Sequence, residues 1–510
     1  MAEPLWSWRD LIAATRGRPE GEAHAGLTGV SIDTRTLQPG DLFVALRGDN
    51  QDGHAYVSKA FKKGAAAALV AEDFVTPAGA GPLVRVSDST RDPSLAALER
   101  LGVAARSRLS PEARVIAVTG SVGKTSTKEM LRVCLTSVDP HTHASEKSYN
   151  NHWGVPLTLA RMPRDTRYGV FEIGMNHPGE ITPLTKMVRP HVAIITTVGP
   201  VHLGFFKSVE EIADAKAEIF AGLEVPEMGS DPMPNPLNEQ CQERGLTQFP
   251  VAVLNADIQY YDRLAAAALQ AGAKARRFGT EVSFDFSLEY IFDRGEKAEV
   301  RARILDQRAV FTLDWSAVHQ VRNAIAALGA CRCLDVDVAA VVAALNEFSQ
   351  GEGRGQRTTF DLKDGQIVLI DESYNANPIS MEGVLVSHSR VASRTHGPRP
   401  RAIAVLGDMR ELGQWADQLH AELADPVKKN SDVVFLCGEH MRALRDRLAK
   451  DTSIPVTWEP KSTDLIPHLL KSGTVQPGDV IMVKGSLGTN MKPIVDALKA
   501  HLTRLAAGRA

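Results

Sequence analysis

The stretch from Val115 to Leu131, VIAVTGSVGKTSTKEML, decides the fold. Its first four residues are apolar and predict a short buried strand, and apolar residues at helical spacing follow from about Thr125. Glycines, a lysine and hydroxyl residues lie between the two patterns, and such a loop can bind phosphate through backbone N–H groups at a helix N-terminus. The predicted phosphate loop is Thr119, Gly120, Ser121, Val122, Gly123, Lys124, Thr125 and Ser126.

This loop predicts binding of a nucleoside triphosphate with a magnesium ion. Lys124 is expected to reach the β- and γ-phosphates, and the hydroxyl of Thr125 is expected to ligate Mg²⁺. The strict phosphate-loop pattern requires a glycine where this chain has Val118. The alternative is an ordinary strand-to-helix turn, which would not explain a Gly-Lys-Thr-Ser sequence at this place.

The composition is that of an ordinary globular protein. The chain has 510 residues, which predicts two or three domains, with 44% hydrophobic and 23% charged residues. A formal net charge of −3 argues against a nucleic-acid partner. We expect no secretory signal and no membrane insertion, because no apolar run approaches about 20 residues. Five scattered cysteines suit a reducing cytoplasm, and the Cys331-x-Cys333 pair lacks the partner pair that a zinc site needs.

We expect an α/β protein with three domains, at residues 1–110, 111–350 and 351–510. Short apolar strands alternate with helical patterns in the second and third blocks, which predicts mostly parallel sheets. In the third block the strand candidates are Ile367–Ile370, Ala402–Leu406, Val433–Cys437 and Val480–Val483. Residues 226–250 are Pro-rich and aperiodic, so we interpret them as a surface loop.

A ribbon of antiparallel strands is expected at the end of the second block. Phe284, Phe286, Leu288, Tyr290 and Phe292 recur at strict period two, and the segment from Val310 to Trp315 is also strand-like. Period two predicts a half-buried strand with these side chains on one face.

Two strand ends place candidate metal ligands beside the phosphate loop. Glu172 ends one apolar run, and His202 follows another. Because ligands bind beyond the carboxyl ends of parallel strands, we expect both side chains to face Thr125 across one crevice. Glu172 would bind Mg²⁺, and His202 would bind a second metal or orient a water. The alternatives are an ordinary surface carboxylate and a loop histidine.

A lysine on the apolar face of a predicted helix is a further candidate. Ser208 and Glu211 form a capping-box pattern, and Lys216 then shares one helical face with Ile212, Ile219 and Phe220. A buried lysine loses proton affinity and can react as a neutral amine. The alternative is that its side chain extends along the apolar surface to solvent.

Further candidates are spread over the last 200 residues. Asn323 lies on an amphipathic helix and could read the edge of an adenine. Asp371 ends a strand and fits a ribose-hydroxyl acceptor, while an arginine, Arg354 or Arg357, fits a clamp on the γ-phosphate. Lys484 ends another strand, where it could stabilise a developing anion.

Together these stretches resemble the Mur ligase family of bacterial cell-wall peptide synthesis. The resemblance spans residues 30 to 490, nearly the whole chain. It is carried by TGSVGKTSTKEM, SYNNHWGVPLTLARM, FEIGMNHPGEI, TTVGPVHLGFF, IADAKAEIF, VLNADI, HQVRNA, GRGQR, DESYNANP, VLGDMRELG and VKGS. NNHWGVPLTL and DESYNANP are typical of the members that add D-alanyl-D-alanine to UDP-N-acetylmuramoyl-tripeptide.

The resemblance implies a fold and an activity. The fold would be a small uridine-nucleotide domain, a central ATPase domain with a phosphate loop, and a Rossmann-like C-terminal domain. The activity would be ATP-dependent amide ligation through an acyl phosphate, in the cytoplasm, and we expect a monomer. The family's phosphate loop lacks the first glycine of the strict pattern, so Val118 fits.

The resemblance also assigns roles to individual residues. ATP would contact the phosphate loop, Asn323, Arg354 and Asp371, and the metal ligands would be Thr125, Glu172, His202 and Lys216. In several relatives the lysine matching Lys216 is carbamylated by CO₂, which would explain its place on an apolar face. Catalytic roles fall to Lys124, His202, Lys216 and Lys484. The substrate-binding residues would be Ser31, Arg35, His54, Asn150, Asn151, Tyr374, Asn375 and Asn377.

Two other functions stay open at this point. One is another amide ligase of the same superfamily, such as a folylpolyglutamate synthetase. The other is a nucleotide-binding scaffold without catalysis.

Overall fold

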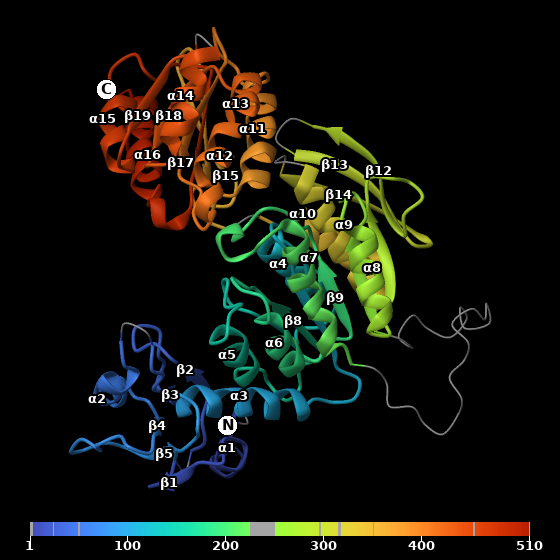
Figure 1. The fold of residues 1–510 in the computed structure, drawn as a ribbon, viewed down its shortest axis with the longest axis vertical. Coiled ribbons are helices and arrows are strands. Elements are labelled where there is room, and N and C mark those ends of the chain that lie inside the picture. Colours follow the sequence, from blue (N-terminus) through green and yellow to red (C-terminus); the bar gives the residue numbers. More distant parts are fainter. Residues whose placement is uncertain are drawn as a thin grey trace.

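Three sheets follow one another along the longest axis of the molecule (Figure 1). The computed structural model describes residues 4–23, 25–48, 51–224, 250–294, 297–314, 318–349, 351–451 and 454–508. The predicted Pro-rich loop at 226–250 lies outside the described residues apart from Pro250.

The N-terminal sheet has five strands in the order β1-β5-β4-β3-β2. They are β1 (Arg18–Glu20), β2 (Gly29–Ser31), β3 (Asp41–Val44), β4 (Ala67–Ala71) and β5 (Leu83–Val86). All pairings are parallel except that of β1 with β5. Helices α1 (Trp8–Thr15) and α3 (Pro93–Ser107) cover one face, and α2 (Val57–Lys62) covers the other.

The central sheet has nine strands in the order β14-β13-β12-β11-β10-β9-β6-β8-β7. They are β6 (Arg114–Thr119), β7 (Thr142–Ala144), β8 (Tyr168–Glu172), β9 (Val192–Ile195), β10 (Val251–Asn255), β11 (Lys274–Gly279), β12 (Phe286–Asp293), β13 (Lys297–Ile304) and β14 (Gln307–Asp314). From β7 across the sheet to β12, a span that includes β6, every strand is parallel to its neighbours. Strands β12, β13 and β14 form the predicted antiparallel ribbon.

Two helical layers cover the central sheet. One layer consists of α4 (Lys124–Val138), α9 (Val318–Cys333) and α10 (Val338–Asn346). The other consists of α5 (Gly154–Ala160), α6 (Ile181–Val188), α7 (Val209–Ala217) and α8 (Tyr261–Gln270). The strands between them are buried on both faces, which explains why their sequences are continuous apolar runs.

The ribbon departs from the prediction at one residue. Phe284 and Phe286 are buried, but Tyr290 and Phe292 are 51% and 42% exposed. The register shifts between Leu288 and Tyr290, which marks a β-bulge. Because a bulge inserts one residue, the period-two series changes face, and the prediction that all five side chains share one face was wrong.

The C-terminal sheet has six strands in the order β15-β16-β20-β17-β18-β19. They are β15 (Gln356–Leu362), β16 (Gly365–Glu372), β17 (Arg401–Gly407), β18 (Val433–Cys437), β19 (Val456–Glu459) and β20 (Asp479–Lys484). Only β15 is antiparallel to its neighbour, and the four predicted strands of this block are confirmed.

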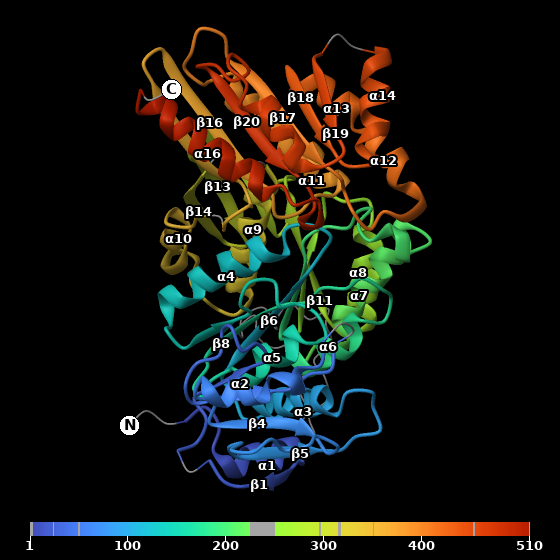
Figure 2. The ribbon, with the colours of Figure 1, turned by 90° about the vertical axis from the view of Figure 1, so that its left-hand side faces the viewer.

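Helices cover both faces of this sheet as well. On one face lie α11 (Pro378–Ala392), α12 (Ala416–Glu422), α13 (Ala424–Asn430) and α14 (Met441–Asp451). On the other lie α15 (Ile466–Leu469) and α16 (Lys492–Ala506). Figure 2 shows α11 low in the C-terminal part, next to the central part of the molecule.

The three sheets agree with a three-domain α/β architecture. No strand in the described ranges pairs across residues 110/111 or 350/351. We therefore propose these two points as the domain boundaries. None of the helices in the described part of the chain is long and apolar enough to cross a membrane.

Candidate functional site

The phosphate loop has the predicted form of a strand, a glycine turn and a helix. Strand β6 ends at Thr119, and α4 begins at Lys124. Gly120 and Gly123 have φ values of 149° and 91°. A Cβ on Gly120 would lie 1.9 Å from the hydroxyl of Thr196, and one on Gly123 would lie 2.6 Å from the side-chain oxygen of Asn323. Both positions therefore require glycine.

Strand order brings the predicted residues to one place. Strand β6 lies between β8 and β9, so Glu172 and the loop that carries His202 flank the phosphate loop. A cavity of about 260 Å³ separates this edge from the C-terminal domain. Its lining includes Ser121, Val122, Gly123, Lys124, Thr125, Ser126, Ser148, Asn150, Glu172, His202, Gly353, Arg354, Glu372, Tyr374, Asn375, Asn377 and Lys484.

Glu172 has the environment expected of a cation ligand. It is 1% exposed, and its Oε1 accepts a 2.7 Å hydrogen bond from Asn150 Nδ2. Its Oε2 is buried without a hydrogen-bond partner. An unpartnered buried carboxylate oxygen beside the hydroxyl of Thr125 fits a magnesium ion, so the surface-carboxylate alternative is wrong. No group of three or more His, Cys, Asp or Glu residues suited to a metal occurs among the described residues, so such a site needs other ligand types.

Lys124 is held at the mouth of the loop. Its Nζ donates to Gly120 O at 2.6 Å. Burial lowers the pKa of Lys124 from its ordinary value, attraction from Glu172 opposes this shift, and repulsion from Arg354 adds to it. An anion bound at the loop would oppose this lowering of the Lys124 pKa.

His202 is fixed by a residue of the C-terminal domain. It has a φ of 55°, and its Nδ1 lies 2.5 Å from Glu411 Oε2. The hydrogen bond from His202 lowers the pKa of Glu411, against the opposing effect of burial. A carboxylate on Nδ1 leaves Nε2 as the ring atom that can bind a metal or a water. Glu411 was not predicted.

Lys216 is buried rather than extended to solvent. Its side chain is 2% exposed, so the solvent-directed alternative is wrong. Burial, and then repulsion from Lys124, lower the pKa of Lys216 well below its ordinary value. It is not among the described residues that line the cavity. The capping box is only half formed, because Ser208 accepts from Glu211 N while the Glu211 carboxylate accepts from Lys207 N.

Arg354 and Tyr374 reach the phosphate loop from the C-terminal domain. The guanidinium carbon of Arg354 lies 4.0 Å from the centre of the Tyr374 ring, and both side chains donate to the hydroxyl of Ser148 at 3.2 Å. Ser148 also lies 3.4 Å from the hydroxyl of Thr125. No role for Ser148 was predicted from the sequence.

Asp371 and Lys484 occupy the ends of neighbouring strands, with different exposure to the cavity. Asp371 is fully buried, accepts from Ser373 N and Oγ, and is not part of the described lining. The next residue, Glu372, faces the cavity, because successive side chains of a strand alternate. Lys484 Nζ donates to Asn375 O at 2.9 Å and lies 3.3 Å from Glu372.

A second cavity of about 380 Å³ lies on the other side of Gly123. Central-domain residues and α11 line it, among them Thr196, Asn255, His319, Asn323 and Ser387. Asn323 is 5% exposed, and its Nδ2 has no hydrogen-bond partner. An unpartnered amide donor beside this cavity is compatible with the predicted contact to a base, which stays a prediction. Burial lowers the pKa of His319 to about 4, helped by repulsion from Lys484 and Arg322, so its ring is neutral at pH 7.

A third cavity, of about 620 Å³, lies at the carboxyl ends of β17, β18 and β19. Side chains of both charges line it, including Asp408, Arg410, Glu411, Glu439 and Lys461. Glu411 thus belongs to this cavity and contacts His202, which lines the cavity at the phosphate loop. The two cavities adjoin at this contact.

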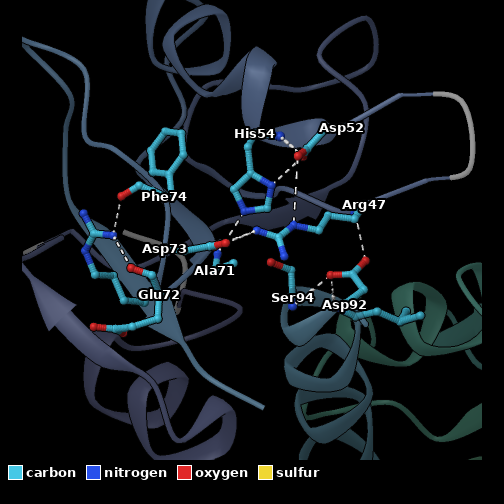
Figure 3. Close-up of polar contacts among 11 residues, drawn as sticks. Arg47, Asp52, His54, Ala71, Glu72, Asp73, Phe74, Asp92 and Ser94 are labelled. Atoms are coloured by element: carbon cyan, nitrogen blue, oxygen red, sulfur yellow. Dashed lines mark hydrogen bonds and ion pairs between the residues drawn. The ribbon is translucent and has the colours of Figure 1, made fainter. Parts of the chain in front are cut away.

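Three predicted substrate residues lie in the N-terminal domain. Ser31 Oγ donates to Asp33 O, and the exposed guanidinium of Arg35 pairs with the Asp33 carboxylate. His54 differs, because both of its ring nitrogens are used internally (Figure 3). Its Nδ1 lies 2.6 Å from Asp52 Oδ1, and its Nε2 accepts from Ala71 N at 2.9 Å. This geometry favours a structural role for His54.

The predicted asparagines divide into two groups. Asn150, Asn375 and Asn377 line the cavity at the phosphate loop, but Asn151 is not among its described residues. Asn151 Oδ1 accepts from Trp153 N and Gly154 N, and Asn377 caps α11 through Ser380 N. Asn151 therefore starts a helix, and the side chain of Asn377 has the same structural role.

Comparisons with known proteins agree with this arrangement. Residues 26–114 match the catalytic domain of the Mur ligase family, residues 118–231 match the Mur ligase middle domain, and residues 353–487 match the Mur ligase glutamate ligase domain. The UDP-N-acetylmuramoyl-tripeptide–D-alanyl-D-alanine ligase of Escherichia coli is 31% identical, over 94% of this chain and 95% of its own length.

Solved structures show the same three-part architecture. A MurF structure from Acinetobacter baumannii has a TM-score of 0.79 at 26% identity, over 98% of this chain and 99% of its own. The MurF ligase of Thermotoga maritima, solved in complex with ADP, has a TM-score of 0.70 at 21% identity, over 93% and 98% of the two chains, and supports the fold alone. From its full-length matches and the site at its phosphate loop, we conclude that this chain belongs to the Mur ligase family.

Proposed function

We propose that this chain is an ATP-dependent ligase that joins D-alanyl-D-alanine to the terminal carboxylate of UDP-N-acetylmuramoyl-tripeptide, in the synthesis of cell-wall peptide. Amide ligation driven by ATP is the activity of the family. The two specific substrates are those in the names of full-length relatives such as the Escherichia coli protein. The observation that carries the proposal is the cavity in which the phosphate loop, the unpartnered oxygen of Glu172 and Arg354 of the C-terminal domain meet.

The reaction begins with transfer of the γ-phosphoryl group of ATP to the peptide carboxylate. The oxygen of the carboxylate attacks phosphorus, the bond to the β-phosphate oxygen breaks, and ADP and an acyl phosphate form. Lys124 and Arg354 place positive charge beside the transferring group. When bound to Thr125, Glu172 and His202, magnesium would neutralise further phosphate charge. The lowered pKa of Lys216 favours the uncharged amine that reacts with CO₂, and a carbamate there would add an anion to the set of ligands.

The second step is attack by an amine on the acyl phosphate. The free amine of D-alanyl-D-alanine adds to the acyl carbon, the tetrahedral intermediate collapses, and phosphate leaves with the amide bond formed. Lys484 lies on the C-terminal wall of the cavity, where its ammonium can stabilise the oxyanion. Its contacts with Asn375 O and Glu372 hold the side chain in place.

The cavity at β17, β18 and β19 is the proposed site of the dipeptide. It carries Arg410 and Lys461 for a carboxylate, and Asp408 and Glu439 for an ammonium group. Because it adjoins the phosphate-loop cavity at the contact of Glu411 with His202, a dipeptide there can direct its amine toward the acyl phosphate. The uridine nucleotide would bind at the end of the N-terminal sheet near Ser31 and Arg35. We further propose that the enzyme acts as a cytoplasmic monomer.

The two alternative functions are less well supported. A folylpolyglutamate synthetase would not need an N-terminal uridine-nucleotide domain, whereas residues 26–114 match a Mur ligase domain. A scaffold without catalysis would not need Lys124, Glu172 and His202 in one cavity.

An ADP-release assay tests the proposal. ATP, the UDP-sugar tripeptide and D-alanyl-D-alanine should together produce ADP and phosphate, and omission of either acceptor should stop turnover. Sugar nucleotides whose tripeptide ends in lysine and in diaminopimelate should be compared, because this comparison identifies the third residue of the natural substrate. Turnover with a folate and glutamate, but not with the sugar nucleotide, would favour the alternative ligase. Absence of ADP in every combination would favour the scaffold.

A further inference from the structure

Three segments distant in the sequence meet at the hydroxyl of Ser148. Ser148 lies in the loop between β7 and α5 and is half-buried. Its Oγ is 3.4 Å from Thr125 Oγ1 of the phosphate loop. It is also 3.2 Å from a guanidinium nitrogen of Arg354 and 3.2 Å from the phenolic oxygen of Tyr374. Thr125 lies in the first turn of α4, while Arg354 and Tyr374 belong to the C-terminal domain.

The hydrogen-bonding capacity of Ser148 is fully used by these three contacts. A serine hydroxyl donates one hydrogen bond and accepts two. Arg354 and Tyr374 both donate to Ser148 Oγ, so both acceptor positions are occupied. The hydrogen of Ser148 is then directed to Thr125 Oγ1. This leaves Thr125 with its own hydrogen and one lone pair for a bound ligand.

The groups around Ser148 are held firmly. Arg354 lies over the face of Tyr374 at 4.0 Å, and Tyr374 N donates to Gly353 O at 3.1 Å, so the two side chains move as one unit. On the other side, Lys147 has a φ of 49°, an uncommon value for a residue other than glycine, and this turn directs Ser148 toward the loop. The two contacts between hydroxyl groups, at 3.2 Å to Tyr374 and 3.4 Å to Thr125, are longer than ordinary O–H···O hydrogen bonds, as in sites that tighten when substrate binds.

We propose that Ser148 is a positioning residue that couples the phosphate loop to the C-terminal domain. A phosphate bound at Thr125 orients the Ser148 hydroxyl, which then holds Arg354 and Tyr374 over the cavity. In the reverse direction, the two donors of the C-terminal domain orient Ser148 and hence the metal-binding hydroxyl of Thr125. The inference rests on the proposed function, since the group that Arg354 approaches is the γ-phosphate of ATP.

The test first compares three variants with the wild-type enzyme. Ser148→Ala should raise the KM for ATP about tenfold, because it removes the acceptor that Arg354 and Tyr374 share. The KM for the UDP-sugar substrate should not change. Ser148→Thr keeps the hydroxyl and should restore most of the affinity for ATP. Ser137→Ala, on the exposed side of α4, removes a hydroxyl that bonds only within its own helix and is the matched control.

A double variant tests the coupling directly. Once Ser148 is alanine, Tyr374→Phe should add little, whereas Tyr374→Phe alone should weaken ATP binding several-fold. Titration with a non-hydrolysable ATP analogue gives the same comparison without turnover, so it remains valid if the wild-type enzyme proves inactive with the proposed substrates. Ser148→Ala binding the analogue as tightly as the wild type, or independent effects of the two changes, would overturn the inference. If Ser148→Ala folds poorly, Tyr374→Phe with Ser148→Thr decides the question.

Discussion

Buried charge is the distinctive feature of this site at the scale of single residues. Glu172 and Lys216 are buried, Lys124 is partly buried, and repulsion from Lys124 lowers the pKa of Lys216. Isolated buried charges are unfavourable unless a partner compensates them. The unpartnered oxygen of Glu172 and the lowered pKa values of the lysines are therefore compatible with the proposed magnesium–ATP complex, which would bring a cation and an anion together.

Replacement of Lys124 should separate nucleotide use from sugar-nucleotide binding. Lys124→Ala removes the amine at the mouth of the phosphate loop. ADP formation should fall about a hundredfold or more, because the transferring phosphoryl group loses the hydrogen-bond donor that stabilises its negative charge. Calorimetric titration with UDP-N-acetylmuramoyl-tripeptide should give the wild-type affinity, because Ser31 and Arg35 lie in another domain. Normal turnover by this variant would reject the assignment of the phosphate loop.

His388 should make the protein sensitive to acid. The ring is fully buried, donates through Nε2 to Val480 O and has an unpartnered Nδ1. Burial lowers its pKa to about 4, against small opposing effects of the hydrogen bond and of Asp432. As the pH falls below 6.5, the unfolded chain gains a proton that the folded chain does not bind. The free energy of unfolding should thus decrease by about 2 kcal/mol between pH 7 and pH 5 through this group.

The measurement for His388 is urea unfolding at several pH values. His388→Gln retains a donor for Val480 O but does not titrate, so its stability should vary less over this range than that of the wild type. His468, an exposed histidine of α15, serves as the control when it is changed in the same way. Identical pH slopes for His388→Gln and the wild type would contradict the prediction.

At the scale of elements, the limits of sequence-based prediction can be traced to particular residues. The strand ends at Glu172 and His202 could be predicted, because a parallel sheet aligns the ends of its strands whatever their separation in sequence. The contacts of Arg354 with Ser148 and of Glu411 with His202 join residues more than 200 positions apart, and no local pattern marks them. The bulge after Leu288 was also missed. Apolar residues still alternate in the sequence on both sides of it, so the sequence pattern does not reveal that the strand changes face there.

The packing of α9 on the antiparallel ribbon allows a sharp prediction. Gly329 faces the ring of Phe286, and a Cβ there would lie 2.4 Å from a ring carbon. Gly329→Ala should therefore destabilise the protein by about 1–3 kcal/mol through overpacking, although alanine favours a helix. Gly383→Ala in α11 is the control, because its nearest atom is 3.5 Å away and the change should be neutral or stabilising. Denaturant unfolding compares the two, and a Gly329→Ala protein as stable as the control would contradict the packing argument.

At the scale of the whole molecule, the central and C-terminal domains touch at a few tight points. A Cβ on Gly199 would lie 1.9 Å from Ile379, and one on Gly204 would lie 3.0 Å from Gly413 N. Gly204 N also donates to Glu411 O at 3.1 Å. These glycines lie in the loop that carries His202, so this loop is both part of the candidate metal site and the contact on which the C-terminal domain rests. Two of the cavities also lie between these domains.

Such an arrangement predicts that ligands draw the domains together. ATP would be contacted by Lys124 on one side and Arg354 on the other, so a bound nucleotide would link the two domains. Small-angle scattering should therefore show a smaller radius of gyration when an ATP analogue and the sugar nucleotide are both present than with either alone. Gly204→Leu places a large side chain against Gly413, so the radius of gyration of this variant should stay large with both ligands present. The phosphate loop itself is unchanged in this variant. If the radius of the wild type is unchanged by the two ligands, or if Gly204→Leu contracts to the same extent, domain closure by the ligands is excluded.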